Sequence, residues 1–107
     1  MRQLRPAELK VWLDDPQREN PVLLDVREPW EFDLCRIDGA RLMPMGAVSS
    51  RLAELDPAKE TVVICHHGVR SFHIARLLEL KGFSQVINLS GGVDAWAKQI
   101  DAAMATY

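Results

Sequence analysis

Cys65 is the residue of this chain best placed to act as a nucleophile. It directly follows a short apolar run, Thr61–Ile64, and precedes the segment His66–Ser71, after which a helical pattern begins at Phe72. A thiol at the end of a strand and the foot of a helix meets backbone N–H groups and the positive end of the helix dipole, which favour its thiolate form. The position therefore predicts a reactive cysteine.

The residues after Cys65 strengthen this interpretation, because the spacing Cys-x-x-Gly-x-Arg-Ser gives each of them a separate task. Gly68 can adopt backbone angles closed to other residues, so that successive N–H groups converge on one anion. Arg70 supplies a positive fork beside the thiolate or an anionic substrate. Ser71 is a suitable N-cap for a helix over Phe72–Lys81. The alternative, a buried structural cysteine before an ordinary turn, is weaker when all three residues are present.

Alternating apolar runs and helical patterns indicate the elements that position this loop. Strands are expected at residues 22–26, 41–43, 61–64 and 86–89, and helices at 6–13, 29–34, 48–55, 72–81 (ended by Gly82) and from 93 onward. This alternation is typical of an α/β fold in which helices cover a mostly parallel sheet. Ligands of such sheets bind at the carboxyl ends of the strands, which is where Cys65 falls.

Four segments, in this order along the chain, resemble the rhodanese-like sulfurtransferases in their single-domain form. They are Leu24–Phe32, Ile37–Ala40, Cys65–Ser71, and Gly82-Phe83 running on to Leu89–Trp96. The resemblance spans nearly all of the chain and implies one rhodanese domain over residues 1–107. It also implies a sheet of about five strands, helices on both faces, and an activity that requires neither an organic cofactor nor a metal.

The thiol and the resemblance together predict sulfur transfer. Cys65 would attack the outer sulfur of thiosulfate or a persulfide, become a persulfide itself, and pass that sulfur to a thiol, cyanide or a sulfur-carrier protein. Loop N–H groups would stabilise the anionic persulfide. The expected substrate-binding loop consists of His66, His67, Gly68, Val69, Arg70 and Ser71.

Two other classes of function stay open at this point. One is a cysteine-based phosphatase or arsenate reductase on a similar fold, and the other is a non-catalytic sulfur-relay or regulatory binding module. Four residues separate Cys65 from Arg70, one fewer than in the phosphatases that the fold resembles. The shorter loop is expected to surround a single sulfur atom rather than a tetrahedral phosphate or arsenate. Binding modules of the family typically lack the cysteine, so its retention favours an enzyme.

Asp25 and Arg27 are possible supporting residues, because they follow a strand on the same side of the sheet as Cys65. They could shape the site or orient its loop. The alternative is a purely local role. Asp25 would then accept backbone N–H bonds in its own turn, and Arg27 would pair with Glu28 or Glu31 at the surface, where an ion pair contributes little.

Other candidate residues carry weaker signals. His66 and His67 could join Cys65 in a metal site, but neighbours on one tight loop rarely aim at one centre, so we expect them to line the mouth of the pocket. Cys35 could act as a resolving thiol, although a small apolar filler is the commoner role. The tail at residues 101–107 shows no chemistry.

The composition sets the broad class of protein. Hydrophobic residues make up 48% and charged residues 26% of the 107 residues, and the formal net charge is −2. These values are typical of a soluble globular protein, and no basic stripe indicates a nucleic-acid partner. No stretch approaches the roughly 20 apolar residues of a membrane span, and the first residues lack the apolar core of a signal peptide. Two cysteines form no disulfide framework, so we expect a cytoplasmic protein without a membrane partner.

Overall fold

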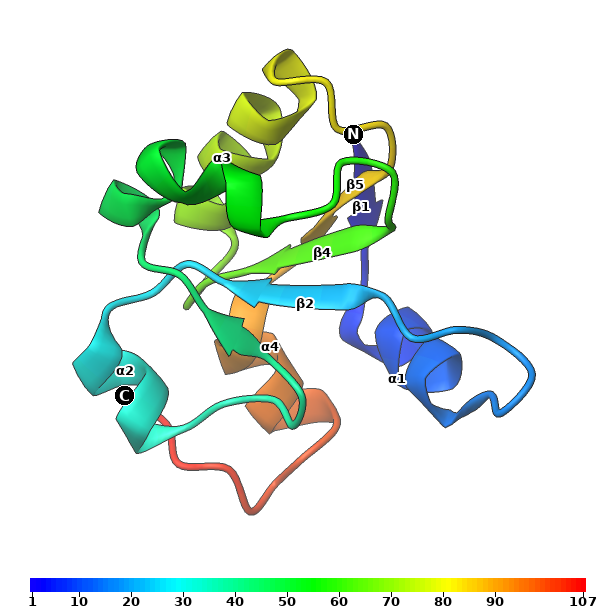
Figure 1. Cartoon of the computed structure of the whole chain (residues 1–107). Coiled ribbons are helices and arrows are strands. Elements are labelled where there is room, and N and C mark those ends of the chain that lie inside the picture. The colour runs from blue at the N-terminus through cyan, green and yellow to red at the C-terminus, as the bar shows by residue number, and fades with distance from the viewer.

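Five short strands form a single parallel sheet at the centre of the molecule (Figure 1). They are β1 (Arg2–Leu4), β2 (Val22–Asp25), β3 (Arg41–Leu42), β4 (Thr61–Ile64) and β5 (Val86–Leu89). Their order across the sheet is β1-β5-β4-β2-β3, so β4, which leads to Cys65, lies in the middle. This computed structural model describes all of residues 1–107. The predicted α/β fold is confirmed.

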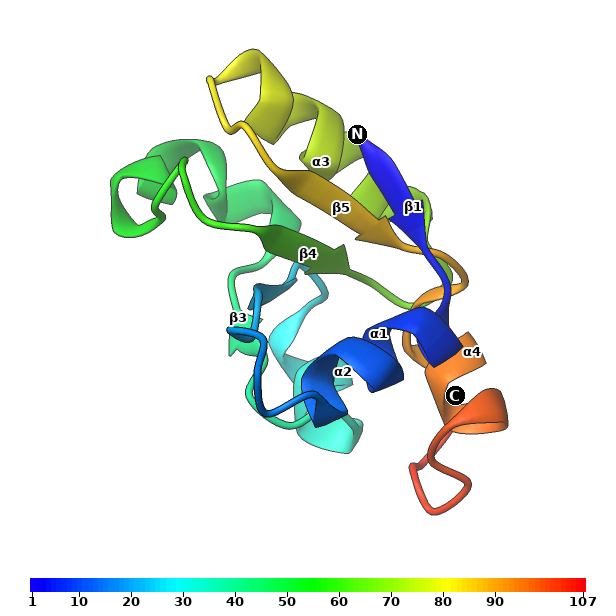
Figure 2. The same cartoon turned by 90° about the vertical axis from the view of Figure 1, so that its right-hand side faces the viewer.

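Helices cover both faces of the sheet. They are α1 (Pro6–Asp14), α2 (Pro29–Leu34), α3 (Val69–Leu80) and α4 (Gly92–Gln99), with two 3₁₀ helices, η1 (Met45–Ala47) and η2 (Ser49–Glu54). Figures 1 and 2 show α1 and α4 on one face, and α3 with the 3₁₀ helices on the other. Pro6 and Pro29 begin α1 and α2, at positions where a helix has no use for a backbone N–H.

The sheet separates two hydrophobic cores. Strand β4 is buried along its whole length, and its side chains alternate between the two faces. Val62 and Ile64 pack under α1 and α4, whereas Val63 and Cys65 pack under α3. Cys65 is thus on the α3 face, while Cys35 belongs to the core on the opposite face.

Three local expectations were wrong. Strand β1 was not expected, because it is a short edge strand in which only Leu4 is buried. The predicted helix over 48–55 consists instead of 3₁₀ turns, interrupted by non-helical backbone at Arg51, although Val48 does point inward. Helix α3 begins at Val69, with Gly68 as its N-cap, rather than at Phe72. Ser71 is therefore inside the first turn and does not cap the helix.

The C-terminal end of α3 follows the prediction. Gly82 has a φ of +92°, the left-handed conformation that favours glycine just after a helix. Its N–H group donates to the carbonyl of Glu79, and the N–H of Phe83 donates to the carbonyl of Leu78. These two bonds satisfy carbonyl groups at the end of the helix, so α3 stops where the glycine predicts.

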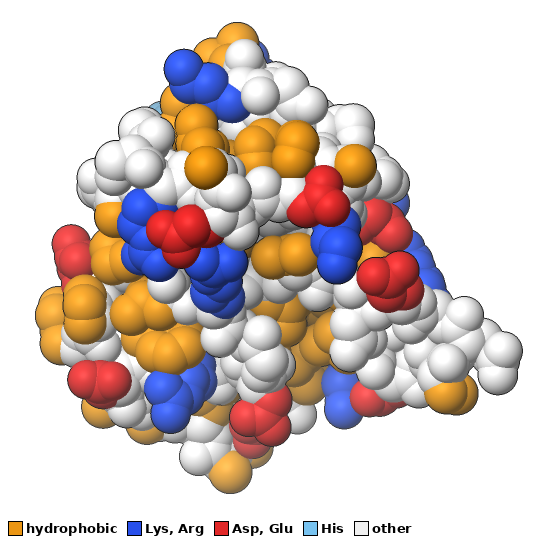
Figure 3. All heavy atoms as spheres, viewed as in Figure 1, with side chains coloured by type: hydrophobic (Ala, Val, Ile, Leu, Met, Phe, Trp, Pro, Cys, Tyr) orange, Lys and Arg blue, Asp and Glu red, His pale blue; other side chains and the backbone are white.

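Acidic and basic side chains are mixed over the face of the molecule seen in Figure 3. Arg41 and Arg51, for example, both pair with Glu54 on the surface. No helix has the length and apolar character that crossing a membrane requires.

Candidate active site

The side chain of Cys65 lies inside the loop between β4 and α3. The backbone N–H of Gly68 donates a hydrogen bond to Sγ over 3.1 Å, and the thiol donates to the hydroxyl of Ser71 over 3.3 Å. Gly68 makes this bond from a backbone with a φ of +101°, which a residue with a Cβ rarely adopts. Cys65 is 1% exposed. The sulfur thus has two hydrogen-bond partners, the Gly68 N–H and the Ser71 hydroxyl, and is shielded from bulk water.

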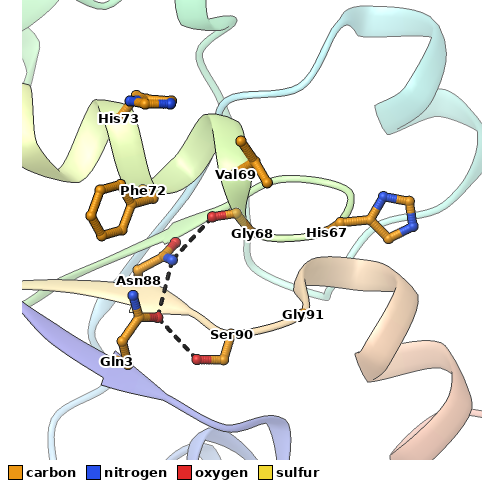
Figure 4. A pocket seen from close by; sticks show the side chains of 9 residues that line it. All are labelled: Gln3, His67, Gly68, Val69, Phe72, His73, Asn88, Ser90 and Gly91. Carbon is orange, nitrogen blue, oxygen red and sulfur yellow. Dashed lines mark hydrogen bonds between the residues drawn. The ribbon is translucent and has the colours of Figure 1, made fainter.

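Ser71 links the sulfur to a buried amide on the next strand. Its hydroxyl donates to Oδ1 of Asn88 over 2.5 Å, while Nδ2 of Asn88 donates to the carbonyl of Gly68 and to Oε1 of Gln3, both over 3.1 Å. Figure 4 shows Asn88 between Gly68 and Gln3. A hydroxyl has one proton to donate. If Cys65 loses its proton, Ser71 can rotate to donate to the sulfur instead of to Asn88.

Backbone hydrogen bonds connect helix α4 to the loop. The N–H of Val93 donates to the carbonyl of Cys65 over 2.9 Å, and the N–H of Asp94 donates to the carbonyl of His66 over 3.1 Å. Only glycine fits at position 92, because a Cβ there would lie 2.3 Å from the Cys65 carbonyl oxygen and 2.4 Å from that of His66. Gly92 thus allows the start of α4 to lie directly against the loop.

Arg70 binds Glu31 of α2. Its two terminal nitrogens donate to the two carboxylate oxygens, each over 2.8 Å. This hydrogen-bonded pairing lowers the pKa of Glu31 to about 2 and raises the pKa of Arg70. The Glu31 carboxylate also accepts bonds from the N–H of Glu28 and the hydroxyl of Tyr107. Arg70 is therefore a brace between the loop and α2.

Asp25 and Arg27 form a fully buried ion pair, with both side chains 0% exposed. The alternative that Arg27 pairs with a glutamate at the surface is wrong, although its Nη1 does reach the backbone carbonyl of Glu31. The same Nη1 donates to the hydroxyl of Tyr107 over 2.9 Å. Burial works against the charged form of Arg27, but its bonds to Asp25 and Tyr107 raise its pKa overall. The pair thus reaches the loop only indirectly, through Tyr107 and Glu31.

Aromatic rings cover the loop beside Cys65. The ring of His66 is stacked between His67, with centroids 3.9 Å apart, and Tyr107, with centroids 3.8 Å apart. Burial and the neighbouring His67 lower the pKa of His66. Both histidines have ligand atoms near the carboxylate of Asp94, all within 4.8 Å. The histidines therefore approach Asp94, and not Cys65 as the metal interpretation assumed.

A groove of about 470 Å³ lies on the outer side of the loop. Gln3, Gly68, Phe72, Asn88 and Ser90 are among its lining residues, and Figure 4 shows the polar members linked to one another by hydrogen bonds. Cys65 does not line it. His73, on α3, also lines the groove and is exposed.

Three residues of the site were not found from the sequence. Asn88 left a signal, because it interrupts the buried run of β5 and a buried amide must find partners. Glu31 was considered only as a surface partner of Arg27, and Tyr107 only as part of a tail without chemistry. No local pattern marks these two, since their partners are far away in the sequence.

Comparisons with known proteins agree with this fold. The rhodanese-like domain family matches residues 6–99, so the chain belongs to the rhodanese-like family. A rhodanese-like domain protein from Staphylococcus aureus has the same fold, with a TM-score of 0.84, 27% identity, and coverage of 100% of this chain and 99% of that chain.

Two relatives are named as sulfurtransferases. The thiosulfate sulfurtransferase GlpE of Pseudomonas putida is 33% identical over 89 residues, which are 83% of this chain and 81% of the relative. The probable adenylyltransferase/sulfurtransferase MoeZ of Mycobacterium tuberculosis is 40% identical over 106 residues, which are 97% of this chain. This chain spans only 26% of the length of MoeZ.

Proposed function

We propose that this protein is a sulfurtransferase that carries sulfane sulfur as a persulfide on Cys65. The observation that carries the proposal is the position of Sγ, which accepts the Gly68 N–H and touches the Ser71 hydroxyl inside a closed loop. Both groups can donate to a thiolate or to the anionic sulfur of a persulfide. The family of the chain and the names of its relatives support the same chemistry.

The reaction has two half-reactions. In the first, the Cys65 thiolate attacks the outer sulfur of the donor, a bond forms between Sγ and that sulfur, and the donor's own bond to it breaks, releasing sulfite from thiosulfate or a thiolate from a persulfide. In the second, an acceptor thiolate, cyanide or carrier-protein sulfur attacks the outer sulfur of the Cys65 persulfide and regenerates the Cys65 thiolate. Each transfer moves one sulfur atom, so no separate oxidant or reductant is needed.

The residues of the loop divide this work. Gly68 and Ser71 hold the sulfur anion, and Asn88 holds Ser71. Arg70 and Glu31 keep the start of α3 in place against α2. Because Cys65 is 1% exposed, we expect the segment His66–Gly68 to move when a donor reaches the sulfur. Of the two histidines expected at the mouth of the pocket, His67 lines the groove beside the loop and His66 does not.

Mass measurement of the intact protein tests this proposal. After incubation with thiosulfate or cysteine persulfide, we expect a gain of one sulfur atom on Cys65, and cyanide should remove it as thiocyanate. Cys65→Ala should gain nothing, whereas Cys35→Ser should load normally. A Cys65→Ala protein that still transfers sulfur to cyanide would overturn the proposal. Hydrolysis of para-nitrophenyl phosphate that depends on Cys65 would favour the phosphatase alternative instead.

A further inference from the structure

Arg70 is the only lysine or arginine in the loop from Cys65 to Ser71, and its charge is already neutralised. Two parallel hydrogen bonds of 2.8 Å join it to Glu31. The Glu31 side chain is 4% exposed and that of Arg70 is 33% exposed. Bidentate pairs of this kind fix the guanidinium in one orientation. The only permanent cation of the loop is therefore already paired with a carboxylate.

Glu31 is itself held by more than Arg70. The N–H of Glu28 donates to it over 2.8 Å and the hydroxyl of Tyr107 over 2.9 Å. These bonds keep the carboxylate in place if Arg70 leaves, and a buried carboxylate without its cation is costly. Separating Arg70 from Glu31 is therefore unfavourable, and we expect the pair to persist when an anionic donor binds.

The other charges near the loop are compensated as well. Arg27 is fully buried against Asp25, and Lys98 pairs with Asp94 at 2.9 Å. Burial lowers the pKa of His66, which works against a positive charge on its ring. The sulfur of Cys65 therefore has the Gly68 N–H and the Ser71 hydroxyl as partners, while Arg27, Arg70 and Lys98 are each paired with a carboxylate.

Sulfur donors differ in the charge that they bring to such a site. Thiosulfate carries two negative charges and leaves as sulfite, so attack by a thiolate gathers three negative charges in one place. An alkyl persulfide, R–S–SH, carries at most one on its sulfur atoms. The Cys65 thiolate attacks its outer sulfur, the S–S bond of the donor breaks, R–S⁻ leaves, and Cys65 keeps the sulfur with its proton. No other reactant is required.

We propose that the donor of this protein is an alkyl persulfide rather than thiosulfate, and that Glu31 determines this preference by neutralising Arg70. The inference rests on the proposed sulfurtransferase function. It assigns to Glu31, on α2, the role of a specificity-determining residue that acts through Arg70.

Two donors of similar size but different charge isolate the effect of donor charge on the rate. Methanethiosulfonate, CH₃SO₂S⁻, resembles thiosulfate in size but carries one negative charge, and it gives up its outer sulfur with methanesulfinate as the leaving group. For the unmodified protein, we expect kcat/KM to be at least tenfold higher for methanethiosulfonate and for cysteine persulfide than for thiosulfate, with cyanide as acceptor. The rate with thiosulfate should change little with ionic strength.

Glu31→Gln removes the negative charge and leaves Arg70 free to attract an anion. We expect kcat/KM for thiosulfate to rise about fivefold relative to methanethiosulfonate, and the rate with thiosulfate to become sensitive to salt. Because Glu31 is buried, this variant could lose stability. Val69→Lys is the second variant, since Val69 is exposed at the start of α3 and a lysine there adds an unpaired cation without touching the core. Val69→Lys should also raise kcat/KM for thiosulfate relative to that for methanethiosulfonate.

The outcomes separate the two proposals. If no donor places sulfur on Cys65, the sulfurtransferase function itself is wrong. If all donors load Cys65 but thiosulfate is the best substrate, only the inference about donor charge fails. A folded Glu31→Gln protein, together with Val69→Lys, in which the ratio between thiosulfate and methanethiosulfonate does not move would also overturn the role of Glu31.

Discussion

The ring of Tyr107 lies parallel to the ring of His66, 3.8 Å away and inclined by 10°. The same tyrosine bridges Arg27 and Glu31 through its hydroxyl, which accepts from the first and donates to the second, each over 2.9 Å. Burial raises the pKa of Tyr107 to about 12, so the hydroxyl keeps its proton throughout the physiological range. Tyr107 thus connects His66, the neighbour of Cys65, to the buried charges of Arg27 and Glu31.

Two substitutions separate the functions of Tyr107. Tyr107→Phe keeps the stack on His66 but removes the hydroxyl, so we expect a loss of about 1.5 kcal/mol in the free energy of unfolding and little change in access to Cys65. Tyr107→Leu removes the stack as well, and iodoacetamide should then alkylate Cys65 several times faster. Urea denaturation and intact-mass kinetics measure the two effects. Equal alkylation rates in both variants would show that the stack does not shield the sulfur.

The pairing of Glu31 with Arg70 should appear in the acid stability of the protein. The pKa of Glu31 is about 2 in the folded protein, against an ordinary value of 4.5. The unfolded chain therefore binds the proton first, so this stabilisation is complete above pH 4.5 and is lost as the pH falls through 2. We expect the free energy of unfolding to fall across that window, and Glu31→Gln to flatten the fall.

Glu54 is the matched control for this measurement. It also pairs with arginine, and its pKa is lowered by Arg51, but the pair is exposed and solvent screens it. Glu54→Gln should therefore leave the acid limb of the stability curve nearly unchanged. Urea titrations at intervals between pH 2 and 7 provide the comparison. A similar flattening in both variants would mean that the Glu31 pair is no stronger than a surface pair.

Gly92 should tolerate no other residue. A Cβ there would meet the carbonyl oxygens of Cys65 and His66 at 2.3 and 2.4 Å, and φ is +59°. We expect Gly92→Ala to cost about 3 kcal/mol and to reduce sulfur transfer, because the loop or α4 must shift. Gly39→Ala, at positive φ but in open space, should cost about 1 kcal/mol, and Gly46→Ala almost nothing. Equal effects at positions 39 and 92 would contradict the role of the close contact.

Loss of the Ser71 hydroxyl should slow sulfur transfer as well as destabilise the protein. Ser71→Ala removes a partner of Sγ and leaves Oδ1 of Asn88 without its donor, so we expect about 1–2 kcal/mol less stability and roughly tenfold slower transfer. Ser90→Ala is the control, because its hydroxyl bonds only to Gln3, farther along the same polar cluster. If both variants slow the transfer equally, Ser71 has no special role at the sulfur.

Cys35 should not discharge a persulfide on Cys65. The two cysteines belong to cores on opposite faces of the sheet, and a disulfide between them would require the sheet to open. We expect Cys35→Ser to keep transfer to cyanide within about threefold, with a modest loss of stability from the buried hydroxyl. Peptide mapping of the oxidised protein is the direct check. A disulfide between Cys35 and Cys65 would refute this arrangement.

The sequence by itself determined the order of the main elements and the place of Cys65. Apolar runs such as Thr61–Ile64 must be buried, and a parallel sheet with helices on both faces is the arrangement that buries them. Gly68 and Gly82 were predicted for a similar reason, and both adopt left-handed backbone. These are local constraints, and each acts over a few residues.

Only the tertiary structure decided which groups surround the sulfur. Arg70 could have faced the substrate, but folding places it against Glu31, 39 positions earlier, and Tyr107 reaches that same carboxylate from 76 positions away. The start of α3 was also set by tertiary contacts, because the Ser71 hydroxyl bonds to Cys65 and Asn88 instead of capping the helix. Charged and polar side chains can be satisfied by many partners, and the packed fold selects among them.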